Sequence, residues 1–133
     1  MMNLNETVNM LDDELLLEEV GVHIKGFIVF CKEKLGIDDE DNSFNLNLHK
    51  DRNGMKTLAN YNPNTGDVNV YIKNRLTADV LRSVAHELVH HKQRLDGKEL
   101  DGTTGSPIED EANAKAGALM REFGEQNPDI YEE

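Results

Sequence analysis

Two histidines and a glutamate stand in a spacing that suits metal chemistry. The chain reads His86-Glu87-Leu88-Val89-His90, an H-E-x-x-H string. Given its histidine and glutamate content, random order would produce roughly 0.02 such strings in a chain of this length. On a helix that turns by about 100° per residue, His86 and His90 leave the same face, only about 40° apart. The string therefore predicts two imidazole ligands of one metal ion.

Glu87 is the candidate general base. It lies about 100° round the helix from His86, where its carboxylate can reach a metal-bound water without binding the metal. The alternative is a helix with two solvated histidines and an ordinary surface glutamate. His91 points about 140° away from His86, so we expect it to pack structurally rather than to bind metal.

A third ligand must come from elsewhere, because catalytic zinc takes three protein ligands and a water. No histidine follows His91, which leaves carboxylates as the next candidates. Glu109 lies beside the apolar stripe of the last predicted helix and is the preferred ligand. Glu111 can pair with Lys115 four residues later and is expected to be solvated. It remains an alternative ligand.

Two further interpretations of these carboxylates stay open. Ser106-Pro107-Ile108-Glu109 is also a capping box, in which Glu109 would only bind back to the Ser106 amide. Asp96 has the spacing of the third metzincin ligand, but Gln93 occupies the position where those proteins need a glycine.

Periodicity predicts the helices that position these side chains. A helix over 77–95, capped by Thr77 and ending near Gly97, buries the face opposite His86. A last helix follows Ser106-Pro107 and ends at Gly124. An earlier amphipathic helix ends at Gly36. Its stripe consists of Leu16, Val20, Ile24, Phe27, Cys31 and Leu35.

Alternation predicts three short strands between the helices. Residues 43–48 alternate as in a half-buried strand, and the turn at 62–66 joins 55–61 to 67–72 as a hairpin. The expected fold class is α+β, with a small antiparallel or mixed sheet, and antiparallel pairing is the simplest arrangement. We expect one domain over 1–133. Its parts are an N-terminal helical region at 1–36, the sheet at 43–73, the catalytic helices at 77–124 and an acidic tail at 125–133.

Composition restricts the partners. The chain of 15.0 kDa carries 14 basic and 26 acidic side chains, a net charge of −12, which repels phosphate backbones. Nucleic acid is therefore not expected as a partner, and no apolar run reaches the roughly 18 residues of a membrane span. Cys31 is the one cysteine, so no disulfide is expected. With no secretory signal pattern, a cytoplasmic location is expected.

The strings His86-Glu87-x-x-His90 and Glu109-x-x-Ala112 together resemble the gluzincin metallopeptidases. The gap of 18 residues between His90 and Glu109 is similar to that of the thermolysin-like branch. Glu109 to Asn113 also resembles the E-x-x-A-N string of ImmA/IrrE-type peptidases, with Lys115 in place of their usual aromatic residue. The resemblance covers residues 77–123.

The resemblance implies a zincin-like fold and a zinc-dependent endopeptidase that cleaves proteins or peptides. One Zn²⁺ would be held by His86, His90 and Glu109, with Glu87 as base and later acid. Asn113 would orient His86, at a position where gluzincins often have Asp. Gluzincins also use a Tyr or His donor for the oxyanion, which no motif fixes here. Candidates by type alone are Tyr61, Tyr71, Tyr131, His49 and Arg94.

Two other functions remain in view. The chain could be a zincin-shaped binding or regulatory module without turnover, or a latent peptidase whose tail from Gln126 to Glu133 fills its own cleft. In the peptidase reading, an extended peptide adds to the open edge of the hairpin. Residues 46–75 carry five basic and two acidic side chains, which favours acidic or extended polar substrates.

Overall fold

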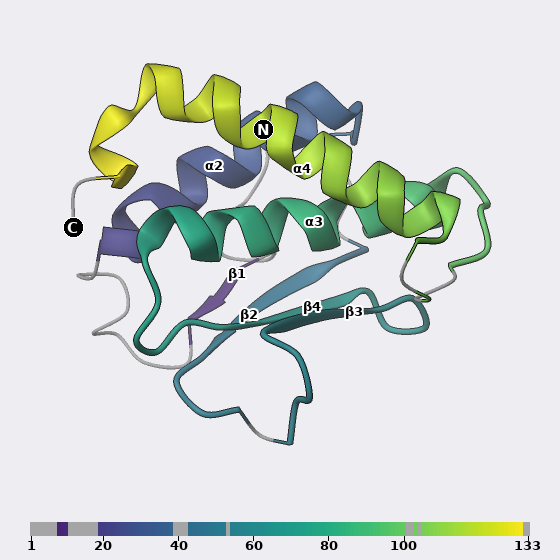
Figure 1. The fold of residues 1–133 in the computed structure, drawn as a ribbon. Helices are drawn as coiled ribbons and strands as arrows, with labels where there is room; N and C mark the ends of the chain where they lie inside the picture. Colours follow the sequence, from purple (N-terminus) through teal and green to yellow (C-terminus); the bar gives the residue numbers. More distant parts are fainter. Residues whose placement is uncertain are drawn as a thin grey trace.

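The protein, seen in a computed structural model, is an α+β fold with its helices on one side of a sheet (Figure 1). The structure describes residues 8–10, 19–38, 43–52, 54–100, 103 and 105–131, and gives the backbone alone for 8–10 and 19–20. The helices are α2 (Glu19–Leu35), α3 (Thr77–Leu95) and α4 (Pro107–Gln126), followed by the short 3₁₀ helix η2 (Pro128–Tyr131).

The described sheet has four strands in the order β1-β2-β4-β3 and is mixed. β2 runs parallel to both β1 and β4, and β3 pairs with β4 antiparallel. β3 therefore forms one edge of this sheet. The strands are β1 (Val8–Met10), β2 (Asn45–His49), β3 (Ala59–Asn62) and β4 (Asp67–Tyr71).

The predicted hairpin is confirmed, and of the two expected kinds of sheet the mixed one forms, so the simplest arrangement of three antiparallel strands is wrong. β4 lies between β2 and β3, so the chain after β2 passes the place of β4 before it turns back. Alternation identifies which face of a strand is buried, and it carries no information about which strand becomes its neighbour. β1 lies within the region 1–36 expected to be helical, and three residues are too few for a period to show.

The two faces of the sheet differ as alternation requires. On the face away from the helices, three asparagine amides form a row across the strands. Asn47 Nδ2 donates to Asn69 Oδ1 at 3.2 Å, and Asn69 Nδ2 donates to Asn60 Oδ1 at 3.0 Å. The row satisfies these amides and favours one register. The opposite face contributes Leu46, Leu48, Val68 and Val70 to the core, none more than 1% exposed.

α3 is the central helix and contacts the sheet, α2 and α4. Its bounds agree with the prediction, but Leu76 is the N-cap and makes no side-chain cap bond, so Thr77 is the first helical residue and not the cap. Gly97 has a φ of 79°, which suits the end of a helix. The buried side of α3 includes Val80, Leu81, Val84 and Leu88.

α4 begins as predicted and ends later. Ser106 Oγ accepts a hydrogen bond from the Glu109 amide at 3.2 Å, which satisfies one of the open donors of the first turn. Gly124 does not end the helix, which continues to Gln126. Its lack of a side chain serves packing instead, because a Cβ there would lie 2.6 Å from Tyr131 Cε2.

α2 ends at Leu35, and Gly36 follows with a φ of 74°. The predicted stripe is confirmed where the structure describes it, since Ile24, Phe27 and Cys31 are fully buried. Leu16 lies outside the described residues. The Phe27 and Phe123 ring centroids are 4.9 Å apart, which joins α2 to α4 within the core.

Candidate metal centre

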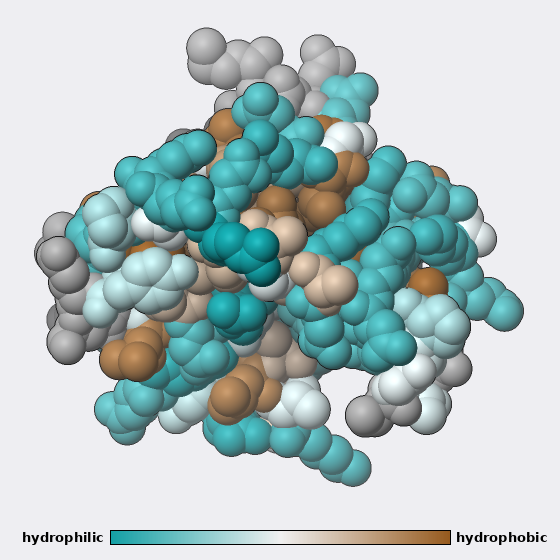
Figure 2. Space-filling model, turned by 45° about the horizontal axis from the view of Figure 1, so that its top comes forward, coloured by the Kyte–Doolittle hydropathy of each residue, from teal (hydrophilic) through white to brown (hydrophobic). Residues whose placement is uncertain are grey.

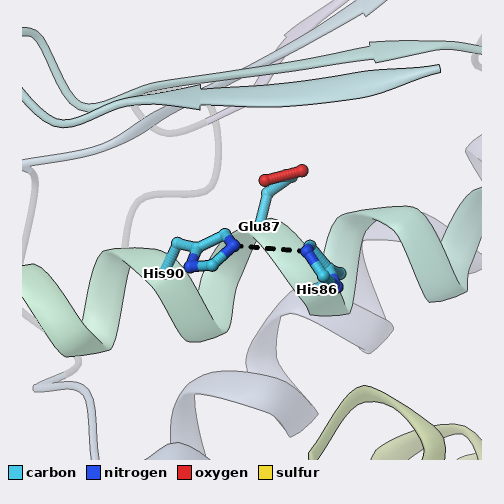
Figure 3. Close-up of side chains that lie close together, drawn as sticks. All are labelled: His86, Glu87 and His90. Atoms are coloured by element: carbon cyan, nitrogen blue, oxygen red, sulfur yellow. Dashed lines mark hydrogen bonds between the residues drawn. The ribbon is translucent and has the colours of Figure 1, made fainter. Parts of the chain in front are cut away.

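The two histidines of the H-E-x-x-H string meet on one face of α3. The Nε2 atoms of His86 and His90 lie 3.2 Å apart, and Figure 3 shows the two rings pointing toward each other along the helix. Behind them, Val84 and Leu88 are at most 1% exposed. The helix is thus anchored on one side and presents two nitrogen donors on the other. This group, with Glu87, could hold a metal ion.

Glu109 reaches the same point from α4. Its Oε1 lies 2.8 Å from His90 Nε2, and its Oε2 lies 3.1 Å from His86 Nε2. The Glu109 amide donates to Ser106 while its carboxylate faces the histidines, so the residue is not confined to a capping role. Three donor groups from two helices therefore converge.

The convergence fits a tetrahedral metal. Ligand atoms about 2.0–2.1 Å from zinc at tetrahedral angles lie roughly 3.3 Å from one another. The nitrogen and oxygen atoms here are separated by 2.8 to 3.2 Å, close to that value. Burial and the neighbouring His90 also lower the pKa of His86, against the opposing effects of Glu109 and Asn113. A lowered pKa favours the neutral imidazole, which is the form that binds metals.

Glu111 and Asp96, the two alternative ligands, lie in other contacts. Glu111 Oε1 accepts from Gln93 Nε2 at 2.8 Å, and its Oε2 lies 3.6 Å from Lys115 Nζ. Asp96 pairs with Lys92 at 3.0 Å. Neither carboxylate contacts the histidine pair, so Glu109 is the acid that completes the group.

Glu87 projects from α3 toward the strands (Figure 3), beside the line between the two histidines. Its carboxylate belongs to the same group of potential ligand atoms, which all lie within 4.8 Å of one another. The side chain is 6% exposed. Burial, and then the charge of Glu109, raise the pKa of Glu87 to about 8. A carboxyl group with a pKa near neutrality is suited to take up and return a proton.

Each histidine has a second partner that orients its ring. Asn113, one turn after Glu109, makes a side-chain hydrogen bond with His86. Gln93 Oε1 lies 2.8 Å from His90 Nδ1, and Gln93 Nε2 donates to the Ile108 carbonyl at 3.1 Å. Because the Gln93 amide nitrogen already donates to α4, its oxygen must accept from His90. The Nδ1 of His90 then carries the proton, and Nε2 is left for a metal.

Sequence reasoning missed Gln93 as a partner of His90. It had appeared only as the residue that replaces a metzincin glycine. The available signal was its place three residues after a ligand on the same helix, which puts both side chains on neighbouring parts of one face. The bonds of Gln93 to Ile108 and Glu111 depend on how α4 docks and have no local signal.

His91 packs as expected. It is fully buried, and its ring centroid lies 5.0 Å from that of Phe44. Its Nδ1 lies 2.8 Å from Tyr61 Oη, which also accepts from Arg94 Nε at 2.7 Å. His91, Tyr61 and Arg94 thus form a polar cluster beneath β3. The position of His91 on the buried flank agrees with the helical angle.

A cleft of about 740 Å³ opens in front of the metal group. Of the five candidates for an oxyanion donor, only Tyr61 lines it. Figure 2 shows a mainly hydrophilic surface with separate hydrophobic patches on the face it presents. The cleft lies between β3, α3 and α4. Its lining is Thr57, Ala59, Asn60, Tyr61, Pro63, Arg82, Ser83, His86, Glu87, His90, Leu100, Glu109, Asn113 and Ala116.

The described part of the tail does not line this cleft. η2 packs against α4, where Ile130 is fully buried and Tyr131 Oη donates to the Met120 carbonyl at 3.4 Å. Of the described tail residues, Ile130 joins the core and none fills the cleft, which is where the tail of a latent peptidase would lie.

Comparison with protein-family models, with curated protein sequences and with solved structures finds no match to this chain. Among the described residues, no helix has the length and apolar character needed to cross a membrane.

Proposed function

We propose that the chain is a zinc-dependent endopeptidase of the gluzincin type. The observation that carries the proposal is the approach of Glu109 to both His86 and His90, within 3.1 Å of each Nε2 atom. Two imidazoles and one carboxylate are the ligand set of thermolysin-like catalytic zinc, which keeps a fourth position for water. The zincin-like arrangement of α3 and α4 is part of this proposal.

Bound zinc would lower the pKa of its water and polarise the substrate carbonyl. Glu87 takes a proton from the attacking water and returns it to the leaving amine. Its raised pKa supports both steps, because the group can hold the proton near neutral pH between them. Gln93 and Asn113 keep the rings of His90 and His86 in the orientation that ligation needs.

An extended substrate pairs with the open edge of β3. β3 lines the cleft through Ala59, Asn60 and Tyr61, and in the described sheet its only strand neighbour is β4. Backbone groups on an edge strand can add a peptide as a further strand. A peptide held there lies opposite Glu87, which projects toward the strands.

The decisive experiment compares Glu87→Gln with the parent protein on unfolded casein. We expect the variant to retain about one zinc per chain and to lose cleavage by about 100-fold or more. Elemental analysis and a peptide-release assay measure the two quantities. Glu111→Gln is the matched control and keeps both. His86→Ala should lose zinc as well. Cleavage that survives in Glu87→Gln rejects Glu87 as the base.

A zincin-shaped binding or regulatory module is the second candidate, and one observation favours it. Tyr61, the one oxyanion candidate in the cleft, already has its hydroxyl engaged by His91 and Arg94. A zinc-loaded protein that remains inert against casein and a peptide library would place this candidate first.

A further inference from the structure

Arg82 is the one positively charged side chain among the residues that line the cleft. It is exposed and lies on α3, one turn before His86. Within the described part of the chain, its guanidinium makes no hydrogen bond or ion pair. A cation without a partner is therefore open to the space where a ligand would lie.

Three other arginines of the fold have structural partners, and the fourth, Arg121, does not line the cleft. Arg75 Nε lies 3.0 Å from Asp79 Oδ2, Arg94 donates to Tyr61 Oη, and Arg52 donates to the Met55 carbonyl. The chain carries 26 acidic side chains against 14 basic ones, so acidic neighbours are abundant. An arginine that pairs with none of these acidic side chains and lies beside a cleft has all its N–H donors available to bind an anion from outside the protein.

The surroundings of Arg82 leave room for that anion. The side chain extends toward α4, where a Cβ placed on Gly117 would lie 3.8 Å from Arg82 Nη1. Ala116, another small residue of α4, also lines the cleft. The helix rises about 6 Å between positions 82 and 86, and an extended peptide advances about 3.3 Å per residue. A group one or two residues from a bond held at His86 thus falls near the guanidinium.

We propose that Arg82 selects peptides that carry a carboxylate one or two residues from the bond presented to the metal group. The guanidinium offers two parallel N–H donors that match a carboxylate. The carboxylate can belong to an Asp or Glu side chain or to the C-terminus of the peptide. The location of that bond rests on the proposed function, whereas the binding preference does not.

The test measures binding, in zinc-loaded Glu87→Gln protein that leaves the probes intact. The probes are fluorescent hexapeptides of Ala and Gln, blocked at both ends. One series carries a single Glu at each position in turn, and one probe has a free C-terminal carboxylate instead. Fluorescence anisotropy should show that at least one carboxylate probe binds about tenfold more tightly than the neutral peptide. Tighter binding of a Glu probe shows that the carboxylate belongs to a side chain, and tighter binding of the probe with a free C-terminus shows that it is the terminal carboxylate.

Substitution of Arg82 then assigns the preference. Arg82→Ala should abolish it and leave the affinity for the neutral peptide unchanged. Arg82→Glu should favour a probe with Lys at the same position. Arg121→Ala removes an exposed arginine of α4 that does not line the cleft and should change nothing. Thermal unfolding of each variant verifies its fold.

Two results would overturn the proposal. One is a parent protein that binds all probes equally, and the other is a preference that persists in Arg82→Ala. Failure of the proposed function has a different signature. A protein that prefers carboxylate probes but never cleaves casein keeps the role of Arg82 and loses the peptidase assignment. A protein that cleaves casein but shows no preference for carboxylate probes keeps the peptidase assignment and loses the role of Arg82.

Discussion

Glu87 is an acid held where burial opposes its charge. Its pKa of about 8 lies above the usual 4.5, so between these values the folded state holds a proton that the unfolded state has released. The free energy of unfolding therefore falls as pH rises from about 4.5 to 8. Burial of Glu87 therefore lowers the stability of the metal-free protein at neutral pH, the condition under which the proposed reaction uses this residue.

The pH dependence gives a prediction for Glu87→Gln in the metal-free protein. At pH 7.5 the variant should have a free energy of unfolding roughly 2–4 kcal/mol above that of the parent. The difference should shrink toward zero near pH 4.5, where the side chain at position 87 is neutral in the folded state of both the variant and the parent. Urea unfolding in the presence of a chelator measures it at each pH.

Glu111→Gln is the control for this comparison. The bond from Gln93 is the main cause that lowers the pKa of Glu111, so neutralising this residue should give no gain at pH 7.5. Equal stability of Glu87→Gln and the parent at that pH would contradict the buried-charge argument.

At the residue scale, local angles sufficed for much of the site. His86, Glu87 and His90 share one helix, so their relative directions follow from the helical repeat. Glu109 could be ranked above Glu111 because the last helix has its own apolar stripe. Gln93 and Arg82 gain their significance only from the position of α4, which no local pattern encodes.

At the element scale, sequence predicted where strands form better than how they pair. β2, β3 and β4 lie within or next to the predicted segments, and the turn after β3 was recognised from its Pro, Asn and Gly residues. The parallel pairing of β2 with β4 arises from burial of side chains across the whole fold. The period of two residues is the same in parallel and antiparallel strands.

Gly66 controls how the hairpin meets β2. It has a φ of 78°, and a Cβ there would collide with the Ser43 carbonyl oxygen. The Gly66 carbonyl also accepts from the Asn45 amide at 2.9 Å. We expect Gly66→Ala to lower the free energy of unfolding by about 2 kcal/mol or more, because backbone strain and a backbone collision add. Chemical denaturation measures the change.

Gly36→Ala is the matched control. Gly36 has a similar φ of 74°, but nothing lies within 4 Å of its added Cβ. Its substitution should cost only about 1 kcal/mol, from the backbone conformation alone. If both variants lose the same stability, the close approach of Ser43 has no energetic weight.

At the scale of the whole molecule, the candidate metal centre joins two helices. His86 and His90 belong to α3, and Glu109 belongs to α4. Gln93 adds a second link through its bond to the Ile108 carbonyl. A cation at this point would bind the folded state and not the unfolded chain, so it should stabilise the fold by mass action.

Added zinc should therefore raise the midpoint of thermal unfolding by roughly 10 °C when its concentration exceeds the dissociation constant several hundredfold. Differential scanning calorimetry measures the shift. Glu109→Ala should reduce it by more than half, and Asp110→Ala, an exposed neighbour on the same turn, should keep it. A full shift in Glu109→Ala would remove Glu109 from the ligand set.

The strand order also has a kinetic consequence. β3 and β4 follow each other directly in the chain and can form a hairpin within microseconds. β2 pairs with β4 only after a much longer loop has closed, which is slower. We expect a nascent hairpin to precede the parallel pairs during refolding. The edge strand β3, along which a peptide would pair, thus forms early with β4. The slowest step of folding is then the addition of β2 and β1 on the other side of β4.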